Sequence, residues 1–582
     1  MMKVNTPKEI VLFLILIVGI IGCSTPASEK GEDKEKKDVY VRSELSWQHG
    51  MELFNMYCAS CHNFSSSGIG PNLAGVTSRM DKDWLIKFIN NPQAVIESGD
   101  EHATQQFEKY QQYMPPFPMI QGEDMEDLLS FINRFSQGEK QNQKNRPGGI
   151  INPVEAKIPY SNLTLDLEEQ FIVPASAENP PLARINKMSA INGGRVFLHD
   201  LNGKLYEVVN KTELREYLDL SAEFENFIHS PGLGSGFGSW AFHPDFEKNG
   251  LFYTTHTEKK NSAPADYSVP DSIGVALQGV LVEWKADDPK AGKFTGSHRE
   301  LMRVDMVSVI HTLQELSFNP LSKPGSSDYG MLYMGIGDAG SALKGYLFLC
   351  DNYGVIWAKV LRIDPLGNNS KNGKYGFPAD NPFVNTPGAL GEIWASGFRN
   401  PHRISWDVTG SGKMFITTIG QHSLEEVNQG EAGGNYGWPY REGTFLFDTE
   451  ANPEIVYPLP DNDTGYLYPV AQYDHDEGNA ISGGFVYFGK KIPELKGKYI
   501  FGDIVRGTLF YAEVAEMEQG RQAPVYRLNV SIDGKPTDME TITRDKRVDL
   551  RIGTDADGEM YILSKANGGV YKIVACKEAP VQ

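Results

Sequence analysis

The sequence has little positive charge for its length. Of its 582 residues, 55 are Lys or Arg and 75 are Asp or Glu, so the formal net charge is −20 and the pI is about 5.1. A chain this acidic is not expected to bind nucleic acid, or an anionic membrane surface, through a basic patch. The charge is therefore interpreted as that of a solvated acidic surface.

The N-terminal apolar run is too short to span a bilayer comfortably. It covers residues 10–21 and follows two lysines, which is the pattern of a targeting segment. Ile20 to Cys23 resembles a bacterial lipobox, so residues 1–23 are expected to be a lipoprotein-type signal peptide that is cleaved before a lipidated Cys23. An ordinary cleaved signal peptide and an uncleaved anchor are the alternatives. In each case we expect export, with the lipid holding the protein on the periplasmic or outer face of a bacterial membrane.

Cysteine is scarce, and the five cysteines divide among three expected roles. Cys23 is assigned to lipid, and Cys58 and Cys61 belong to the CxxCH motif described below. Cys350 and Cys576 remain. In an oxidising compartment they could form a disulfide, and two isolated buried thiols are equally compatible with the sequence.

The length favours two domains over one compact core. Residues 24–40 have almost no apolar side chains and predict a disordered tether. Residues 41–137 carry apolar side chains at helical spacing and predict a small all-α domain. Residues 138–165 begin with a polar stretch bearing Gly and Pro and are interpreted as a linker. Residues 166–576 are rich in Gly, Asn, Asp and aromatic residues and predict an all-β domain.

The most specific local motif is Cys58-Ala59-Ser60-Cys61-His62. Its spacing suits covalent attachment of a haem, with both thiols bonded to the vinyl groups and the imidazole of His62 on the iron. A disulfide redox pair or half of a zinc site is the alternative. No second CxxC or histidine pair completes a zinc set in the sequence, so the motif favours haem.

A source for the sixth iron ligand follows about fifty residues later. Met114 precedes two prolines, which hold the chain extended and let the thioether project sideways. Met119 is the fallback, and Met114 could instead fill a core. Helical patterns lie at 47–57, 84–89 and 123–135. With the motif, they resemble a single-haem class I cytochrome c domain, in which the carbonyl of Pro71 would lie near the axial histidine.

The large domain repeats short apolar-aromatic strands at uneven intervals, which suits propeller blades with insertions better than a tandem repeat. We predict a six-bladed β-propeller, because that fold leaves few exposed strand edges. A pair of β-sandwiches is the alternative. The predicted strands begin near Arg195, Leu251, Leu332, Met414, Tyr499 and Met560.

Several motifs of this domain, in their shared order from about Ile185 to Ile573, resemble the glucose/sorbosone dehydrogenase family. That family comprises six-bladed propellers, including aldose sugar dehydrogenases that use pyrroloquinoline quinone (PQQ) and calcium. The motifs are Ala241 to Phe246, Gly337 to Gly340, Leu361 to Pro365, Gly397 to Arg403, Gly433 to Pro439 and Ile481 to Gly484.

The resemblance implies a set of site residues. His311 takes the place of the general base, and a neutral imidazole suits removal of a proton from a sugar hydroxyl. Arg399 and Asn400 match the pair that contacts PQQ, where a guanidinium can polarise a quinone carbonyl. The implied calcium ligands are the carbonyls of Gly420 and Gln421 together with Glu426 and Tyr436, and oxygen donors suit this hard cation.

The chain departs from the family pattern at several positions. Leu313 and Gln314 stand where relatives have glycines after the histidine, and Gly234 aligns with a glutamine that commonly touches PQQ. Tyr-Phe-Gly replaces Tyr-Arg-Gly at residues 487–489. Arg547 or Arg551 is expected to supply a basic contact late in the chain, without a preference between the two.

The sequence therefore predicts an exported quinohaemoprotein that oxidises an aldose or related sugar with PQQ. It would pass electrons to its own c-type haem and then to a downstream acceptor, such as another cytochrome or a respiratory chain component. The alternative is a non-catalytic glycan-binding propeller tethered to an electron-transfer cytochrome c.

Overall fold

The computed structural model describes residues 40, 42–59, 61, 62, 64, 70–110, 113–136, 146–178, 181–210, 213–230, 232 and 234–578. The predicted signal peptide, Cys23 and all of the predicted tether except its last residue lie outside the described residues, and so does the linker up to residue 145. From Arg42 onward the chain forms one compact unit. None of the helices described by the structure is both long and apolar enough to cross a bilayer.

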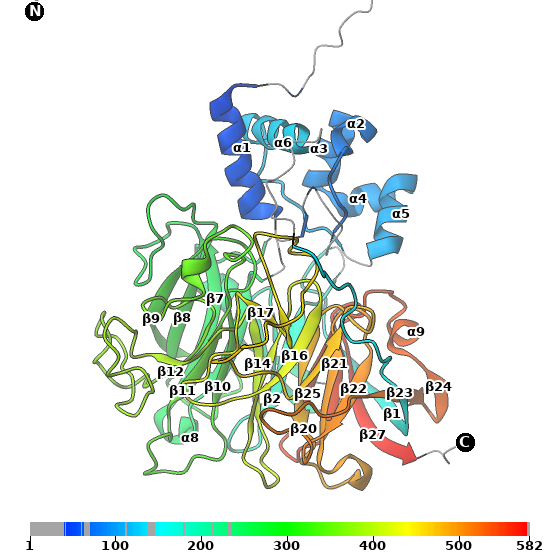
Figure 1. The fold of residues 1–582 in the computed structure, drawn as a ribbon. Coiled ribbons are helices and arrows are strands. Elements are labelled where there is room, and N and C mark those ends of the chain that lie inside the picture. The colour runs from blue at the N-terminus through cyan, green and yellow to red at the C-terminus, as the bar shows by residue number, and fades with distance from the viewer. Residues whose placement is uncertain are drawn as a thin grey trace, which may run out of the picture. The chain divides into compact units, whose positions relative to one another are not determined.

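The N-terminal region is helical (Figure 1). The three predicted helical segments correspond to α1, α3 and α6, and three helices that were not predicted, α2, α4 and α5, lie between them. The side chain of Ser43 accepts the amide of Ser46 and begins α1, and Asp81 caps α3 in the same way. Helix α1 packs against α6 through Gly50, where a Cβ would lie 1.9 Å from the carbonyl oxygen of Asp127. The bounds are α1 Glu44–Tyr57, α2 Val76–Arg79, α3 Lys82–Asn90, α4 Pro92–Glu97, α5 Glu101–Tyr110 and α6 Glu123–Ser136.

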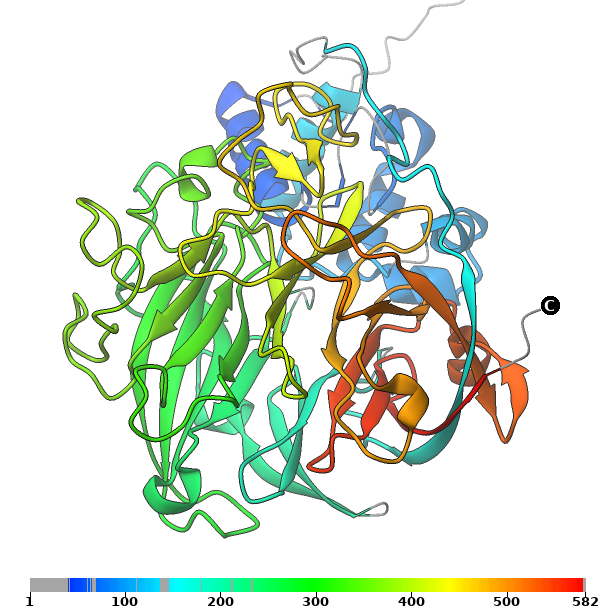
Figure 2. The same ribbon diagram turned by 60° about the horizontal axis from the view of Figure 1, so that its bottom comes forward.

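The larger region is a β-propeller (Figures 1 and 2). Among the described residues, four of its sheets are separate and four-stranded. Their strands are β2 Ile185–Ala190, β3 Val196–Asp200, β4 Lys204–Asn210 and β5 Glu213–Asp219; β6 Phe237–Phe242, β7 Leu251–Lys259, β8 Leu277–Ala286 and β9 Gly296–Met306; β10 Leu313–Phe318, β11 Leu332–Ile336, β12 Lys359–Ile363 and β13 Ile393–Ser396; and β14 Pro401–Trp406, β15 Met414–Thr418, β16 Leu424–Gln429 and β19 Ala471–Asp474.

The remaining large sheet contains nine described strands. Two four-stranded runs join where β1 pairs in parallel with β23, and β1 also pairs antiparallel with β27. An early strand is therefore built into the last part of the domain, which closes the ring. The strands are β20 Ile481–Val486, β21 Lys498–Asp503, β22 Leu509–Glu513, β23 Tyr526–Ile532, β1 Tyr160–Ile172, β27 Gly569–Glu578, β26 Met560–Ser564, β25 Leu550–Thr554 and, paired with β23, β24 Lys535–Thr537.

Short elements complete the described part of the chain. They are α7 Leu220–Glu223, α8 Phe246–Asn249, α9 Met539–Thr543, the 3-10 helices η1 Leu347–Leu349 and η2 Pro493–Leu495, and the hairpin of β17 Arg441–Glu442 with β18 Phe445–Leu446.

The six strands predicted from the sequence correspond to β3, β7, β11, β15, β21 and β26, each the second strand of a four-stranded run. The propeller prediction is confirmed over the alternative of two sandwiches. Its count of six blades stays a prediction, because two of the runs are hydrogen-bonded into one sheet.

The first strands of the runs follow one another round a ring. Strand β10 contacts β6 and β14, β14 contacts β20, and β25 contacts both β20 and β2. Figure 2 shows the sheets succeeding one another round the domain, from cyan through green and yellow to red. Residues at the starts of these first strands therefore gather at one end of the ring.

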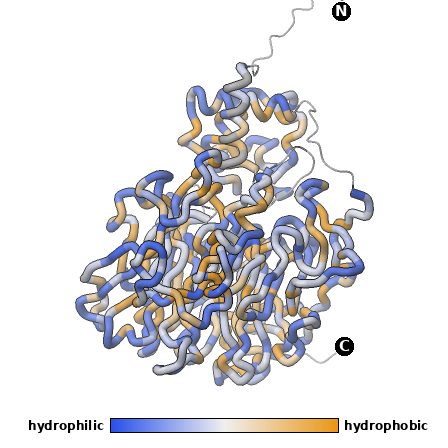
Figure 3. Tube along the Cα trace, turned by 60° about the vertical axis from the view of Figure 1, so that its left-hand side comes forward, coloured by the Kyte–Doolittle hydropathy of each residue, from blue (hydrophilic) through white to orange (hydrophobic). Residues whose placement is uncertain are grey.

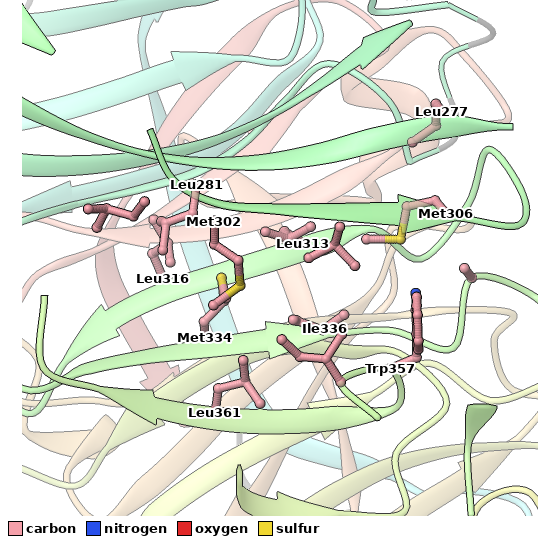
Figure 4. Close-up of a cluster of buried hydrophobic side chains, with 14 of the residues drawn as sticks. Leu277, Leu281, Met302, Met306, Leu313, Leu316, Met334, Ile336, Trp357 and Leu361 are labelled. Atoms are coloured by element: carbon pink, nitrogen blue, oxygen red, sulfur yellow. The ribbon is translucent and has the colours of Figure 1, made fainter. Parts of the chain in front are cut away.

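Apolar side chains fill the space between neighbouring sheets. In the cluster of Figure 4, Leu281 and Met302 from one sheet meet Leu313, Met334 and Leu361 from the next, and all five are fully buried. Hydrophobic segments run through the interior, whereas many connecting loops are hydrophilic (Figure 3). Burial of this kind contributes about 1.5–3 kcal/mol per large side chain, which fixes the sheets that carry the candidate site.

The two cysteines left over from the sequence analysis are both free and buried. Cys350 packs with Trp438 and Phe447, whereas Cys576 belongs to the core of the nine-stranded sheet. Isolated thiols, and not a disulfide, are what the structure contains at these positions.

Candidate functional sites

The CxxCH motif lies at the C-terminal end of α1, with Cys58 as the capping residue. The imidazole Nδ1 of His62 lies 3.0 Å from the carbonyl oxygen of Pro71, to which it can donate. This is the contact that the sequence predicts for Pro71. It leaves Nε2 of His62 as the nitrogen for iron. A Cβ at Gly70 would lie 2.4 Å from this ring, so glycine is needed there.

Cys58, Cys61, His62 and Met114 line one apolar pocket. The donor chemistry and the apolar walls fit a haem held by two thioethers, an imidazole and a methionine. Met119 is 48% exposed and does not line the pocket. The walls come mainly from α3, α5 and α6, through Trp84, Leu85, Phe88, Ile89, His102, Ala103, Gln106, Phe107, Leu129 and Ile132.

In the propeller, His311 lies directly before β10 in a left-handed backbone conformation with φ of 51°. Strands β10 and β11 are antiparallel, with Leu313 opposite Ile336. Residues just before β10 and just after β11 therefore meet, and His311 Nδ1 lies 2.8 Å from Asp338 Oδ1. Asp338 lies in the family motif Gly337 to Gly340, and the sequence alone indicates no role for it. The signal that was available is its position just after a predicted strand.

Asp338 is held by three donors. Its Oδ1 accepts from His311 and from the amide of Gly340 at 2.8 Å, and its Oδ2 accepts from the indole of Trp438 at 3.1 Å. Burial alone would raise the pKa of this carboxyl, but the bond from His311 and the charge of Arg399 lower it. The carboxylate therefore stays ionised and fixes the orientation of the imidazole.

The pKa of His311 is lowered to about 4, mainly by burial and also by the charge of Arg399, against the opposing effect of Asp338. The ring is thus neutral at neutral pH. With Nδ1 donating to the carboxylate, Nε2 carries the lone pair that a general base requires.

Two departures from the family pattern have a steric explanation in the structure. A Cβ at Gly234 would lie 2.9 Å from the backbone nitrogen of His311, so a glutamine does not fit without a shift. Leu313 is buried. The glycines that allow close packing here are Gly238 and Gly279, which lie against Leu313. A Cβ would lie 2.5 Å from Leu313 O at Gly238 and 2.1 Å from a Leu313 methyl carbon at Gly279.

Arg399 is buried next to this pair, and its carbonyl accepts the amide of Asp338 at 2.8 Å. Its guanidinium donates to Gln421 Oε1 at 2.8 Å and to Gly420 O at 2.6 Å. Two buried polar atoms nearby have no partner in the described residues, namely Asn400 Oδ1 and Gln421 Nε2. The guanidinium and Gln421 Nε2 are donors and fit a ligand that carries carbonyl and carboxylate groups, as PQQ does, whereas Asn400 Oδ1 is an acceptor and requires a donor from the ligand.

Several of the atoms predicted to bind calcium are already hydrogen-bonded within the protein. Both carboxylate oxygens of Glu426 accept N–H groups, from Gly443 at 2.7 Å and Asn428 at 2.9 Å. The hydroxyl of Tyr436 donates to a backbone carbonyl at 2.5 Å, so only its own carbonyl is left as a ligand. Gly420 O already accepts from Arg399. Within the described ranges, no cluster of three His, Cys, Asp or Glu side chains is arranged to hold a metal.

Of the two late arginines, Arg551 is the one that contacts a neighbouring first strand. It lies on β25 and its Nε donates to Asn186 Oδ1 on β2 at 2.8 Å. From β14, Arg403 reaches the carbonyl of Asn186 at 3.2 Å. Arg547 is instead paired with Asp549 at 3.4 Å.

Two family models match the chain. The model described as Glucose / Sorbosone dehydrogenase matches residues 182–572, and the model described as Cytochrome c matches residues 48–136. The first match covers more than half of the chain and the second covers the helical region with its CxxCH motif.

Individual relatives are distant. The HIPL1 protein of Arabidopsis thaliana is 28% identical over 326 residues, which are 49% of this chain and 45% of that protein. Quinoprotein glucose dehydrogenase B of Acinetobacter calcoaceticus is 28% identical over 219 residues, 35% of this chain and 40% of that protein. The chain spans about half the length of the curated relatives it matches. A crystal structure of a glucose dehydrogenase aligns over 70% of this chain and 99% of its own, with a TM-score of 0.51 and 16% identity, and supports the fold alone.

Proposed function

This chain belongs to the glucose/sorbosone dehydrogenase family and carries a cytochrome c domain, and from that premise we propose that it is a PQQ-dependent aldose dehydrogenase with a built-in c-type haem. The substrate is an aldose or a related sugar oxidised at a CH–OH group. Electrons leave the protein through the haem to a separate acceptor. Export and a lipid anchor on Cys23 are part of the same proposal.

The hydrogen bond between His311 and Asp338 is the observation that carries this proposal. It holds a neutral imidazole in the tautomer whose Nε2 can accept a proton. Asp338 also stabilises the imidazolium that forms when His311 takes the hydroxyl proton of the sugar. Positioned general bases of this kind contribute about 10²- to 10⁴-fold to a rate.

Arg399 and Asn400 would hold the cofactor. When bound, PQQ supplies a quinone that accepts hydride, and a haem supplies an acceptor of single electrons. Arg399 is kept in place by Gln421 and Gly420, so its guanidinium is oriented before any ligand arrives. Such preorganisation avoids reorganisation at the moment of reaction and is a main source of electrostatic stabilisation.

Cys58, Cys61, His62 and Met114 would hold the haem, because all four line one pocket. A cytochrome on the same chain has a high effective concentration at the dehydrogenase, which is the physical advantage of the fusion. Ligation by His62 and Met114 would raise the potential of the iron and favour its reduction.

The test follows haem absorbance in full-length protein supplied with PQQ and calcium while a panel of aldoses is added. We expect reduction by at least one sugar, loss of that reduction in His311→Ala, and retention in His298→Ala, whose histidine is exposed. Haem that stays oxidised with every sugar, although PQQ is bound, would contradict the proposal. Profiling with alcohols and aldehydes in the same assay would then identify a different substrate class.

The second candidate is a propeller that binds glycans without catalysis. The departures at Gly234, Leu313 and Gln314 favour it, because they alter positions near the base. Failure of the full-length protein to bind PQQ, together with sugar binding by calorimetry, is the result that would support this reading.

A further inference from the structure

Buried positive charge exceeds buried negative charge where the first strands of the propeller converge. Lys187 and Arg403 share one carboxylate, Glu315, at 2.7 and 2.5 Å. Arg551 lies 3.9 Å from Asp549, which also pairs with Arg547 at 3.4 Å. Buried charges are expensive unless each is paired, and Lys187, Arg403 and Arg551 have no carboxylate that any of them holds alone.

Lys565 lies in the same region. Only 6% of this residue is exposed, and its amino group has no hydrogen-bond or ion-pair partner among the described residues. Strands β25 and β26 are antiparallel with Leu550 opposite Ser564, so Lys565 lies beside Asp549, whose carbonyl accepts its amide at 3.3 Å. The side chain of Asp549 is already taken by the two arginines. A lysine amino group without a protein partner, close to arginines, is available to bind an anion.

The groups around Lys565 are mostly cationic. Burial lowers its pKa well below the ordinary value, and Arg551, Arg184 and Arg547 lower it further, against the opposing charge of Asp549. Arg184 is occupied by Asn202 and by the backbone carbonyls of His229, Gly232 and Ser235. An anion bound here would restore the charge of Lys565 and relieve repulsion among the arginines.

The position of Lys565 relates it to the candidate active site. His311 lies just before β10, the first strand of its run, and Asp338 lies just after β11, the second. In the same way, Asp549 lies just before β25 and Lys565 just after β26. Both pairs therefore lie at the same end of the propeller. Strand β25 contacts β20 and β2, whereas β10 contacts β6 and β14, so the two pairs belong to runs that are not neighbours in the ring. His402, on β14 between them, is affected by the charges of both Lys565 and His311.

We propose that Lys565, together with Arg551, binds a carboxylate of the quinone cofactor, at a distance from the part of the cofactor that His311 and Arg399 contact. The inference rests on the proposed function, because it assigns a residue to the cofactor named there. PQQ is an extended planar ring system with several carboxylates on its edge, and a ligand of that form can reach both ends of the site. The basic contact expected from Arg547 or Arg551 thus becomes a pair, Arg551 and a lysine that the sequence analysis did not single out.

The experiment measures PQQ binding to full-length apoprotein by fluorescence titration, with Lys565→Met, Lys565→Arg and, as a control, the exposed Lys535→Met. A hydrogen bond to a charged group contributes enough that Lys565→Met should weaken PQQ binding about 10- to 100-fold. Lys565→Arg should recover most of the affinity, and Lys535→Met should match wild type. The trimethyl ester of PQQ, which has no carboxylate charge, should bind wild type and Lys565→Met equally.

Calorimetry in two buffers of different ionisation enthalpy gives a second readout. Wild type should take up protons when PQQ binds, and Lys565→Met should take up fewer. Apo Lys565→Met should fold and melt at or above the wild-type temperature, because an amino group without a protein partner is replaced by an apolar side chain of similar length.

The role of Lys565 and the proposed function can fail separately. Equal PQQ affinity in wild type and Lys565→Met, with wild type binding PQQ, would overturn the role of Lys565 and leave the proposed function standing. No PQQ binding to wild type would remove both. If Lys565→Met keeps its PQQ affinity but loses a preference for glucuronate over glucose, the site serves an acidic sugar, and the cofactor assignment is wrong.

Discussion

His311 and Asp338 are 27 residues apart in the chain and are joined by a hydrogen bond of 2.8 Å from the imidazole Nδ1 to a carboxylate oxygen. The antiparallel pairing of β10 with β11 creates this contact, because it places the residue before one strand beside the residue after the other. Trp438 and Gly340 hold the carboxylate from its other sides. A base, its orienting group and the support of that group are thus fixed by three separate loops.

Asp338→Asn should lower kcat for sugar oxidation about 10²- to 10⁴-fold, because the amide no longer fixes the tautomer of His311 or stabilises its protonated form. The carboxylate raises the pKa of His311, so its removal lowers that pKa below about 4. The base is active when unprotonated, so the acid limb of the pH profile should move to lower pH.

The measurement is kcat/KM against pH for wild type and Asp338→Asn in the reconstituted protein. The wild-type acid limb should lie near pH 4 and not near 6.5, the ordinary value for histidine. A limb that moves to higher pH in the variant would contradict the assigned hydrogen bond.

Gly337→Ala should destabilise the propeller and reduce activity together. The new Cβ would lie 2.4 Å from the Cβ of His311 and 2.6 Å from its carbonyl oxygen, so the backbone of the base must shift. Overpacking of this kind costs about 1–3 kcal/mol in free energy of unfolding.

Urea unfolding of the full chain tests this, with Gly410→Ala as the matched control, because nothing lies within 4 Å of a Cβ at that glycine. Equal loss of stability in both variants would show that the contact with His311 is not the cause.

Met114→Leu should remove the sixth iron ligand, and it should lower the haem midpoint potential, because a thioether ligand raises it. Met119→Leu should leave the potential unchanged, since Met119 is half exposed and lies outside the pocket. Spectroelectrochemical titration of both variants decides between the two methionines. A fall in potential confined to Met119→Leu would reverse the assignment.

Glu426→Gln should weaken calcium binding if Glu426 is a ligand, because one carboxylate charge is lost while the shape is kept. The measurement is PQQ binding during a calcium titration after chelation, with the exposed Glu518→Gln as control. If wild type, Glu426→Gln and Glu518→Gln all need the same calcium concentration for PQQ binding, Glu426 is not a calcium ligand.

Local sequence predicted the elements of this fold well. Apolar spacing located α1, α3 and α6, and short apolar-aromatic runs located the second strand of every four-stranded run. Helices α2, α4 and α5 were missed. The first and second have four and six residues, which carry too little periodicity, and α5 has ten residues of which few are apolar. The role of Pro71 followed from resemblance and agrees with its contact to His62.

The site was predicted less completely. His311, Arg399 and Asn400 were named, whereas Asp338 and Lys565 received no role, because a lone aspartate or lysine has no local pattern that distinguishes it from a surface residue. Gly234 counted against catalysis in the sequence, yet in the structure the backbone of His311 leaves no room for a side chain there. Such a requirement comes from a neighbour distant in the chain.

The sequence by itself determined what is encoded over short distances. The spacing of Cys58, Cys61 and His62, the helical and strand periodicities and the ordered motifs of the propeller all act through residues close in the chain. The tertiary structure alone decided which charges meet. Asp338 meets His311, two arginines share Asp549, and Lys565 is left without an anion, because these pairings depend on strand register and on the closure of the ring. In a buried site such pairings set the pKa values and the ligand chemistry.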